Sequence, residues 1–257
     1  MNPEHNETIN VGGNAIAVRC RPGKVPGLVW LGGYKSDMAG TKADTLDAWA
    51  AEAGLAFTRH DYSGHGISGG RFEDGTISRW LDESLAAFER FTEGPQILVG
   101  SSMGGWIALR MAQELAKAGK SDRLAGMLLI APAPDFTVEL MEPELTDAQR
   151  RELETKGYLE EPSEYSDEPN IYTKALFDDG RKNRVLTGVI DTHCPVHILQ
   201  GKADPDVPYT HAQKLMEHLS ADDATLTLVR DGDHRLSRPE DLELLTRTAQ
   251  GLVQQLT

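Results

Sequence analysis

The sequence predicts an α/β protein with a doubly wound, mostly parallel β-sheet and helices on both of its faces. Short apolar runs bounded by glycine or proline alternate along the chain with longer segments of helical periodicity. A long acidic stretch at residues 133–191 interrupts this alternation and indicates an insertion. The composition, 39% hydrophobic and 26% charged over 257 residues, is that of a globular protein rather than a disordered chain.

The strands are predicted from short, mostly apolar runs of four or five residues. Such runs are typical of parallel strands, because helices cover both faces and no polar alternation is needed. They lie at residues 28–31, 55–59, 96–99, 127–130, 196–199 and 225–229. Residues 8–11 and 15–20 flank a Gly-Gly-Asn turn, which predicts an antiparallel hairpin at one edge of the sheet.

The helices are predicted where apolar residues recur three or four positions apart, since this spacing lines one face of a helix. These segments are residues 42–53, 77–91, 106–117 and 210–219. Each follows a predicted strand, so the order is that of a doubly wound sheet.

Residues 133–191 are expected to form a cap of short helices over the carboxyl edge of the sheet. The stretch is rich in acids, prolines and tyrosines, and its clearest helix begins near Thr146. Connections longer than about 12–15 residues usually carry structure or function of their own. A flexible acidic excursion is the alternative. The core then comprises residues 1–132 and 192–257.

The charge balance excludes a general affinity for nucleic acid. The chain has 26 Lys and Arg against 40 Asp and Glu, a formal charge of −14. No apolar run reaches the length of a membrane span, and the first ten residues do not resemble a targeting signal. Cys20 and Cys194 stand far apart, with no metal-binding or redox spacing. We therefore predict a cytoplasmic protein without a metal ion.

A Gly-x-Ser-x-Gly motif lies between a predicted strand and a predicted helix. The motif is Gly100-Ser101-Ser102-Met103-Gly104. A turn of this kind holds its serine in a strained conformation above the sheet, and the small flanking residues let neighbouring backbone pass. The sequence therefore predicts Ser102 as a nucleophile.

A serine nucleophile needs a base, and the base needs an acid that orients it. In this architecture the acid follows the serine and the histidine comes last. Asp204 follows the strand at 196–199 and His234 follows the strand at 225–229. We predict Asp204 as the acid and His234 as the general base, with Asp206 as the alternative acid.

Two backbone N–H groups are expected to stabilise the oxyanion of an acyl-transfer intermediate. One belongs to Met103, at the start of the helix after the nucleophile. The other belongs to Tyr34, in the loop after the strand at 28–31, where Gly32 and Gly33 let the backbone approach the substrate. A simple tight turn is the alternative for these glycines. His65 lies in another glycine-rich loop and is expected to bond backbone groups in a structural turn.

These residues resemble an α/β-hydrolase over most of the chain. Three segments are similar to the mitochondrial acyl-protein thioesterase and acyl-glucuronide esterase branch of that superfamily: GYKSDM-A-GTK at 33–42, DYSGHG at 61–66 and TEGPQILVGSS at 92–102. The segment SEYS at 163–166 also looks like that branch. The chain departs from the wider pattern where Gly32-Gly33 replaces a common His-Gly.

The resemblance implies a Ser-Asp-His hydrolase that cleaves thioesters or esters through an acyl-enzyme without a cofactor. Its substrate is expected to be a small-molecule ester or an acylated protein. An acyltransferase or peptidase with the same residues, or a non-catalytic binding protein, remains as an alternative. Leu140, Met141, Tyr165 and Phe177 are the cap residues expected to line an acyl site. The sequence sets neither the acyl-chain length nor the oligomeric state.

Overall fold

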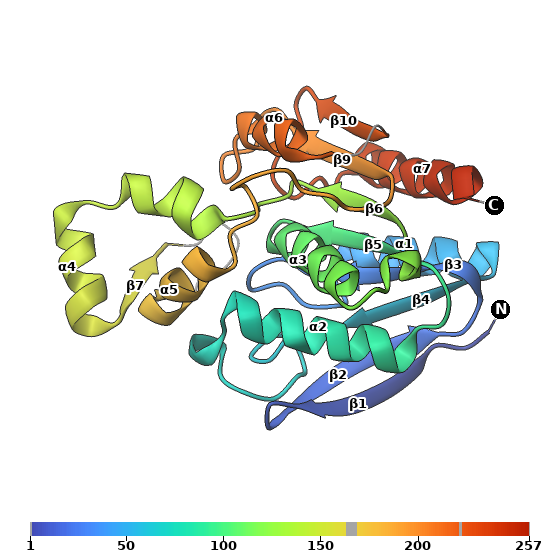
Figure 1. The fold of residues 1–257 in the computed structure, drawn as a ribbon, viewed down its shortest axis with the longest axis horizontal. Coiled ribbons are helices and arrows are strands. Elements are labelled where there is room, and N and C mark those ends of the chain that lie inside the picture. Colours follow the sequence, from blue (N-terminus) through green and yellow to red (C-terminus); the bar gives the residue numbers. More distant parts are fainter. Residues whose placement is uncertain (1, 163–168, 221–222, 257) are drawn as a thin grey trace.

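The computed structural model describes residues 2–162, 169–220 and 223–256, and its centre is a mixed β-sheet (Figure 1). Within these residues the sheet has eight strands in the order β1-β2-β4-β3-β5-β6-β9-β10. The strands are β1 His5–Val11, β2 Asn14–Arg21, β3 Lys24–Leu31, β4 Leu55–His60, β5 Gln96–Ser101, β6 Leu124–Ile130, β9 Val196–Gly201 and β10 Ala224–Val229.

The sheet is parallel except at the edge formed by the N-terminal hairpin. β1 pairs with β2 in an antiparallel register that places His5 opposite Cys20 and Val11 opposite Asn14. β2 is also antiparallel to β4, and the other neighbouring strands of this described sheet run parallel. The predicted doubly wound, mostly parallel sheet is confirmed.

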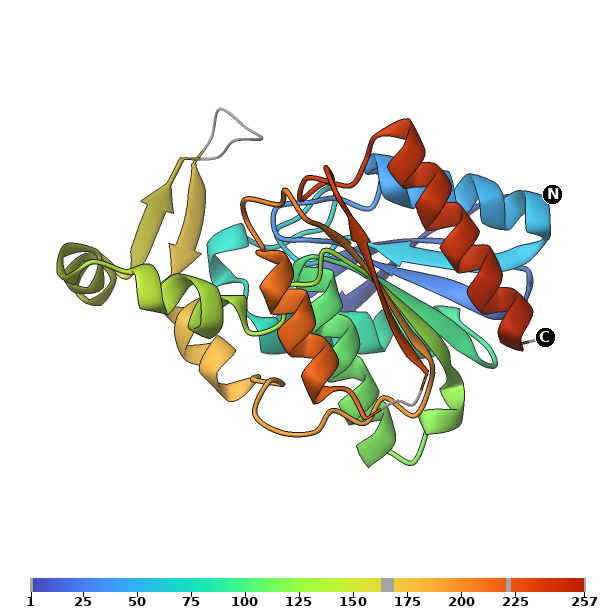
Figure 2. The same ribbon diagram turned by 90° about the horizontal axis from the view of Figure 1, so that it is seen from above.

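Helices cover both faces of the sheet (Figure 2). Leu46 of α1 and Leu245 of α7 belong to one buried cluster, whereas Trp80 of α2, Leu109 of α3 and Leu215 of α6 belong to another. The bounds are α1 Thr41–Ala53, α2 Ile77–Phe91, α3 Met103–Lys117, α6 Tyr209–His218 and α7 Pro239–Leu256, with short 3₁₀ helices η1 Phe72–Asp74 and η2 Ser121–Arg123. No described helix combines the length and the apolar character that crossing a bilayer requires.

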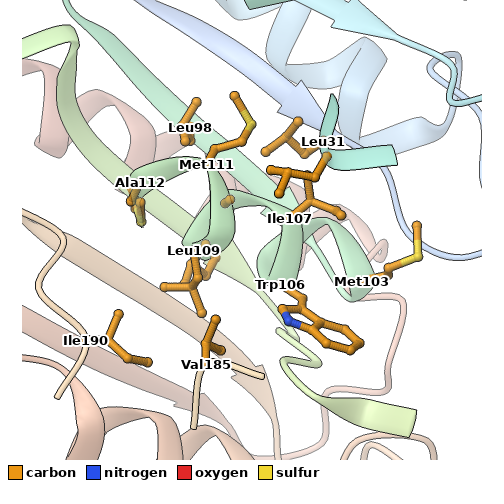
Figure 3. Packing of buried hydrophobic residues seen from close by; sticks show 14 of the residues in the cluster. Leu31, Leu98, Met103, Trp106, Ile107, Leu109, Met111, Ala112, Val185 and Ile190 are labelled. Atoms are coloured by element: carbon orange, nitrogen blue, oxygen red, sulfur yellow. The ribbon is translucent and has the colours of Figure 1, made fainter. Parts of the chain in front are cut away.

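Strand β5 is buried on both faces, which explains its uninterrupted apolar run. Leu98 packs among residues of α3 such as Ile107 and Met111 (Figure 3). Ile97 and Val99 point to the other face and belong to the cluster under α1 and α7. Successive side chains of a strand alternate between faces, so a central strand between two helical layers needs apolar residues throughout.

The chain between β6 and β9 projects beyond one end of the sheet in both views (Figures 1 and 2). We call residues 133–191 the insertion. Its elements are a π-helix η3 Thr137–Met141, a 3₁₀ helix η4 Glu142–Glu144, α4 Asp147–Lys156, β7 Tyr158–Glu161, β8 Asn170–Thr173 and α5 Lys174–Lys182. Thr146 caps α4 in a reciprocal arrangement with Gln149, as its position before a helical pattern predicts.

The antiparallel pair β7 and β8 was not predicted from the sequence. Each strand has only four residues, and β7 (Tyr-Leu-Glu-Glu) is followed by further acids and a proline. A run this short carries too little periodicity to be recognised alone. The insertion is therefore a mixed α and β structure rather than a purely helical one.

One buried and one partly buried polar contact hold the base of the insertion together and join it to the core. The carboxylate of Asp135 accepts hydrogen bonds from the N–H groups of Val185 and Leu186, both at 2.8 Å. On α5, Asp179 accepts from the N–H and the hydroxyl of Ser78 on α2, also at 2.8 Å. These bonds join the two ends of the insertion to each other and to the helical layer below.

Replacing Asp135 is expected to destabilise the protein. In Asp135→Ala two buried N–H groups lose their acceptor, and an unsatisfied buried group costs about 1–3 kcal/mol. The free energy of unfolding, measured in urea, should fall by about 2–4 kcal/mol. Asp178→Ala on α5 is the control, because its ion pairs with Lys174 and Arg181 are exposed and screened by solvent. Equal effects of the two changes would contradict this account.

Candidate active site

Ser102 occupies the junction between β5 and α3 in a backbone conformation that side chains rarely adopt. Its φ is 54° and its ψ is −118°, a conformation that costs about 1–3 kcal/mol and persists only where the surroundings hold it. The N–H of Ser102 donates to Ile130 on β6 at 2.9 Å, and its carbonyl accepts from Ala133 at 3.1 Å. Strand β6 and the start of the insertion therefore hold the serine in place.

Two glycines of the motif allow the backbone to pass closely on either side of Ser102. A Cβ atom at Gly100 would lie 2.4 Å from the carbonyl oxygen of Gly104. A Cβ atom at Gly104 would lie 2.0 Å from the carbonyl oxygen of Leu31 on β3. Both contacts would be with backbone atoms rather than with flexible side chains, so the spacing of glycines in the motif has a steric cause.

The structure brings Ser102, His234 and Asp204 together at the carboxyl ends of three parallel strands. His234 Nε2 lies 3.0 Å from Ser102 Oγ, and His234 Nδ1 lies 2.9 Å from Asp204 Oδ2. The three residues follow β5, β9 and β10, respectively. Although 132 positions separate the serine from the histidine, the parallel sheet places both at one edge.

The carboxylate of Asp204 is held by donors other than the histidine. The N–H groups of Asp206 and Val207 donate to its Oδ1 at 2.9 and 2.8 Å, and Gln200 Nε2 donates to its Oδ2 at 3.0 Å. The side chain is fully buried. These bonds orient the carboxylate toward the imidazole.

Asp206 lies close to the same group without taking that position. One ligand atom each of Asp204, Asp206 and His234 lies within 4.8 Å of the others. Both ring nitrogens of His234 already have hydrogen-bond partners, Ser102 and Asp204. Of the two acids that the sequence left open, Asp204 is the one in contact with the imidazole.

The residues of both expected oxyanion donors lie near the serine. Met103 is the first residue of α3, so its N–H belongs to the positive end of the helix dipole. The loop after β3 also reaches the site, because the Cβ position of Gly33 is 4.0 Å from Ser102 Oγ. Tyr34 follows directly, and both Tyr34 and Met103 line the cavity next to the serine.

His65 supports the loop that contains Tyr34. Its Nε2 accepts from the N–H of Lys35 at 3.2 Å, and its Nδ1 donates to the carbonyl of Ser63 at 3.1 Å. Burial lowers the pKa of His65 to about 4, so the ring is neutral near pH 7 and Nε2 is free to accept. The predicted structural role of His65 in bonding backbone groups is confirmed.

A cavity of about 680 Å³ opens around Ser102 and is lined by two kinds of residue. From the insertion, the start of α3 and the loop after β9 come Ala133, Phe136, Leu140, Met141, Tyr172, Met103 and Val207. From the loop after β3, the start of α1 and the loop after His234 come Ser36, Thr41, Lys42, Arg235 and Ser237. The cavity thus has a mainly apolar part and a polar part that contains Lys42 and Arg235, and Glu161 and Asp206 add acidic groups to its lining.

Leu140 and Met141 line this cavity, as the sequence predicts for an acyl site. Phe177 does not: it is fully buried in the core of the insertion with Leu145, Leu153 and Leu159. The helix α5 turns that side chain inward because the insertion needs an apolar core of its own. Tyr165 lies outside the residues that the structure describes.

Sequence reasoning missed two residues that shape the site. Gln200 donates to Asp204 from the end of β9, and a polar side chain at the carboxyl end of a mostly apolar strand was the signal for it. The side chain of Tyr34 reaches across to the insertion and donates to the carbonyl of Ile171. No local sequence pattern predicts that contact, because its partners are 137 positions apart.

The comparisons with known proteins identify the family of this chain. The sequence model of the alpha/beta hydrolase family matches residues 25–243, and the chain belongs to that family. It is 33% identical over 244 residues to palmitoyl-protein thioesterase ABHD10, mitochondrial, of Bos taurus, covering 94% of this chain and 78% of that protein.

Two solved structures resemble the chain over nearly its whole length. A putative hydrolase from Agrobacterium vitis S4 is 58% identical, with a TM-score of 0.93 and coverage of 98% of this chain and 99% of that one. Alpha/beta hydrolase domain-containing protein 10 from mouse is 30% identical, with a TM-score of 0.89 and coverage of 98% and 100%. The predicted class, a hydrolase of ester or thioester bonds, is confirmed, as is the resemblance to the acyl-protein thioesterase branch.

The prediction of a cytoplasmic location is contradicted by these relatives. Five curated relatives match, and all of them are named as mitochondrial thioesterases. The prediction rested on the N-terminal composition and on two isolated cysteines. Neither feature determines the compartment in which a protein is located.

Gly104→Ala is expected to destabilise the protein and to disturb Ser102. Its Cβ would collide with the carbonyl of Leu31, so the free energy of unfolding should fall by about 1–3 kcal/mol, as in overpacked cores. The rate at which a fluorophosphonate labels Ser102 should also fall. Gly251→Ala in α7 is the control, since its Cβ would meet nothing within 4 Å. That change should stabilise the helix by about 1 kcal/mol. A Gly104→Ala protein with unchanged stability and labelling would contradict the steric argument.

Proposed function

We propose that the protein is a serine thioesterase that removes fatty acyl groups from cysteine thiols through an acyl-enzyme on Ser102. The observation that carries the proposal is the position of His234, in hydrogen-bond contact with Ser102 on one side and Asp204 on the other. The thioesterase name of the relatives supports the choice of substrate. Ester substrates with the same acyl group share this chemistry.

The proposed reaction begins with proton transfer from Ser102 Oγ to His234 Nε2 as the oxygen attacks the acyl carbonyl carbon. Asp204 holds the imidazole by its Nδ1–H and stabilises the positive charge that develops on the ring. The N–H groups of Met103 and Tyr34 donate to the carbonyl oxygen as it becomes negative.

Collapse of the tetrahedral intermediate breaks the bond from carbon to sulfur. His234 returns its proton to the departing thiolate, and the acyl group remains on Ser102. A water molecule then repeats the sequence: His234 takes its proton, the oxygen attacks the ester carbon, and Ser102 leaves with the proton. The products are a thiol and a carboxylic acid, and no cofactor takes part.

The insertion acts in this proposal as a cap over the acyl group. Phe136, Leu140, Met141 and Tyr172 give one part of the cavity an apolar lining, and the cavity volume of about 680 Å³ is in the range of ordinary ligand pockets. Burial of an acyl chain there is favourable by about 0.8 kcal/mol per methylene. The apolar part therefore fits the acyl chain.

The polar part of the cavity then faces the leaving group. Lys42 donates from its ammonium group to the carbonyl of Arg235, directly after the proposed base. Burial lowers the pKa of Lys42 to about 8, and the hydroxyls of Ser36 and Thr41 lie in the same lining. Such groups suit the amide and carboxylate groups of a peptide that carries the acylated cysteine.

Ser102→Ala and Asp204→Asn test the proposed roles. Loss of a triad member typically lowers kcat by about 10⁴-fold or more, so both variants should be nearly inactive on S-palmitoyl peptides. Asp206→Asn is the matched control and should retain most of the activity. A fluorophosphonate should label Ser102 in the wild-type protein. Labelling at another residue, or greater damage from Asp206→Asn than from Asp204→Asn, would contradict the assignment.

Met141→Trp should shorten the acyl chains that the enzyme prefers. A larger side chain reduces the apolar part of the cavity, and one methylene is worth about 1–3 kcal/mol in such a pocket. The ratio of kcat/KM for palmitoyl over butyryl thioesters should therefore fall by about tenfold or more. Val189→Trp is the control, because Val189 is exposed on the same insertion. An unchanged ratio in Met141→Trp would show that the insertion does not contact the acyl chain.

A further inference from the structure

The side chain of Tyr34 connects the loop after β3 to strand β8 of the insertion. Its phenol O–H donates a hydrogen bond to the carbonyl oxygen of Ile171. Its ring stacks on Tyr172, with the ring centres 5.1 Å apart and the planes inclined by 13°. Both partners belong to β8, so one side chain of the core holds this strand by a polar and an apolar contact.

The aromatic surroundings restrict the Tyr34 ring to one place. Phe72, Trp80 and Phe136 meet it edge-on, with ring centres 4.9, 5.9 and 6.0 Å away. Burial raises the pKa of the Tyr34 phenol well above its usual value, so the phenol stays a donor at neutral pH. A ring held this firmly transmits a shift of β8 to its own backbone.

The next residue is tied to both the core and the insertion. The N–H of Lys35 donates to His65 Nε2 at 3.2 Å, and its ammonium group donates to the carbonyl of Pro169 at 3.0 Å. The backbone of Lys35 has φ 55°, a left-handed conformation that costs energy for a residue with a side chain. The bond to His65 compensates for that cost.

Hydrogen bonds rather than close packing hold the outer side of this loop. A hollow of about 410 Å³ lies there, and Lys35, His65, Pro169 and Ile171 are among the residues that line it. On the inner side, the Cβ position of Gly33 is 4.0 Å from Ser102 Oγ. The loop therefore lies between an open space and the proposed nucleophile.

We propose that Tyr34 is a positioning residue whose phenol, through Ile171, sets the place of its own backbone N–H beside Ser102. The inference rests on the proposed function, since that N–H is the second proposed oxyanion donor. Oxyanion donors act only within a narrow range of distance and direction. Strand β8 of the insertion thereby becomes a support of the oxyanion site as well as part of the cavity wall.

The phenol oxygen and the backbone N–H of Tyr34 have different roles in this proposal. The N–H contacts the reacting oxygen in the proposed mechanism, whereas the phenol acts on it through the backbone. Loss of the phenol bond should therefore weaken binding of the transition state and leave binding of the ground state nearly unchanged. If the phenol only stabilised the fold, its loss would not affect transition-state binding and ground-state binding differently.

Tyr34→Phe tests the proposal, because it keeps the stacked ring and removes the bond to Ile171. Complete loss of an oxyanion donor costs about 10²–10³ in kcat, and a displaced donor should cost less, so kcat should fall about tenfold and KM should change less than twofold. The dissociation constant of octylboronic acid, whose serine adduct is tetrahedral, should rise by the same factor as kcat falls. The affinity for octanoate, a planar product, should stay unchanged.

Tyr158→Phe is the matched control on β7 of the same strand pair. It removes a phenol oxygen that has no part in the contact with the loop and should leave kcat and boronate affinity as in the wild type. His65→Phe is a second, independent variant, since it keeps a ring among Tyr62, Phe72 and Trp80 but removes the acceptor for the Lys35 N–H. It should likewise lower kcat and boronate affinity and leave KM and octanoate affinity nearly unchanged. Because both bonds hold one loop, the double variant should lose less than the product of the single losses.

The outcomes distinguish this inference from the proposed function. If wild-type Ser102 is neither labelled by a fluorophosphonate nor needed for hydrolysis, the proposed function itself fails. If the wild type is active and labelled while both variants keep kcat and boronate affinity, only the positioning role is overturned. A rise in KM with matching loss of octanoate affinity also overturns it, since that would place the effect on acyl binding. If Tyr34→Phe does not fold, the same measurements on His65→Phe decide the question.

Discussion

The left-handed backbone of Ser102 is the constraint on which the rest of the site depends. It turns the chain from β5 into α3 within one residue. Close backbone packing around Ser102 holds it in this unfavourable conformation. Gly100 and Gly104 permit the packing, because a Cβ at either position would collide with a carbonyl group. The same turn exposes the hydroxyl at the edge of the sheet and directs the first N–H groups of α3 toward it.

The parallel sheet completes the site by collecting residues that are distant in sequence. Asp204 and His234 follow β9 and β10. Strand β6 lies between β5 and β9, and the carbonyl of its Ile130 accepts a hydrogen bond from the N–H of Ser102. Each strand thus contributes either a side chain or a backbone contact at one edge. A change in the register of any of these strands would move one partner out of hydrogen-bond distance.

Two contacts hold the insertion in place, and they serve different purposes. At its base, the buried carboxylate of Asp135 joins its two ends, which is a contribution to stability. At β8, the bond from Tyr34 to Ile171 joins it to the loop beside Ser102. The first contact holds the two ends of the insertion together, and the second places β8 against the loop that carries a proposed oxyanion donor.

The sequence by itself determined the doubly wound sheet, the place of Ser102 and the order of acid and base. Local sequence patterns predict these features: apolar runs, helical spacing and a glycine motif between a strand and a helix. Tertiary structure alone decided that Asp204 rather than Asp206 meets His234, that Phe177 packs inside the insertion, and that Tyr34 reaches Ile171. It also revealed β7 and β8, whose four residues each are too few for a periodic signal. These outcomes depend on contacts between segments tens of residues apart, and such contacts leave no pattern in either segment alone.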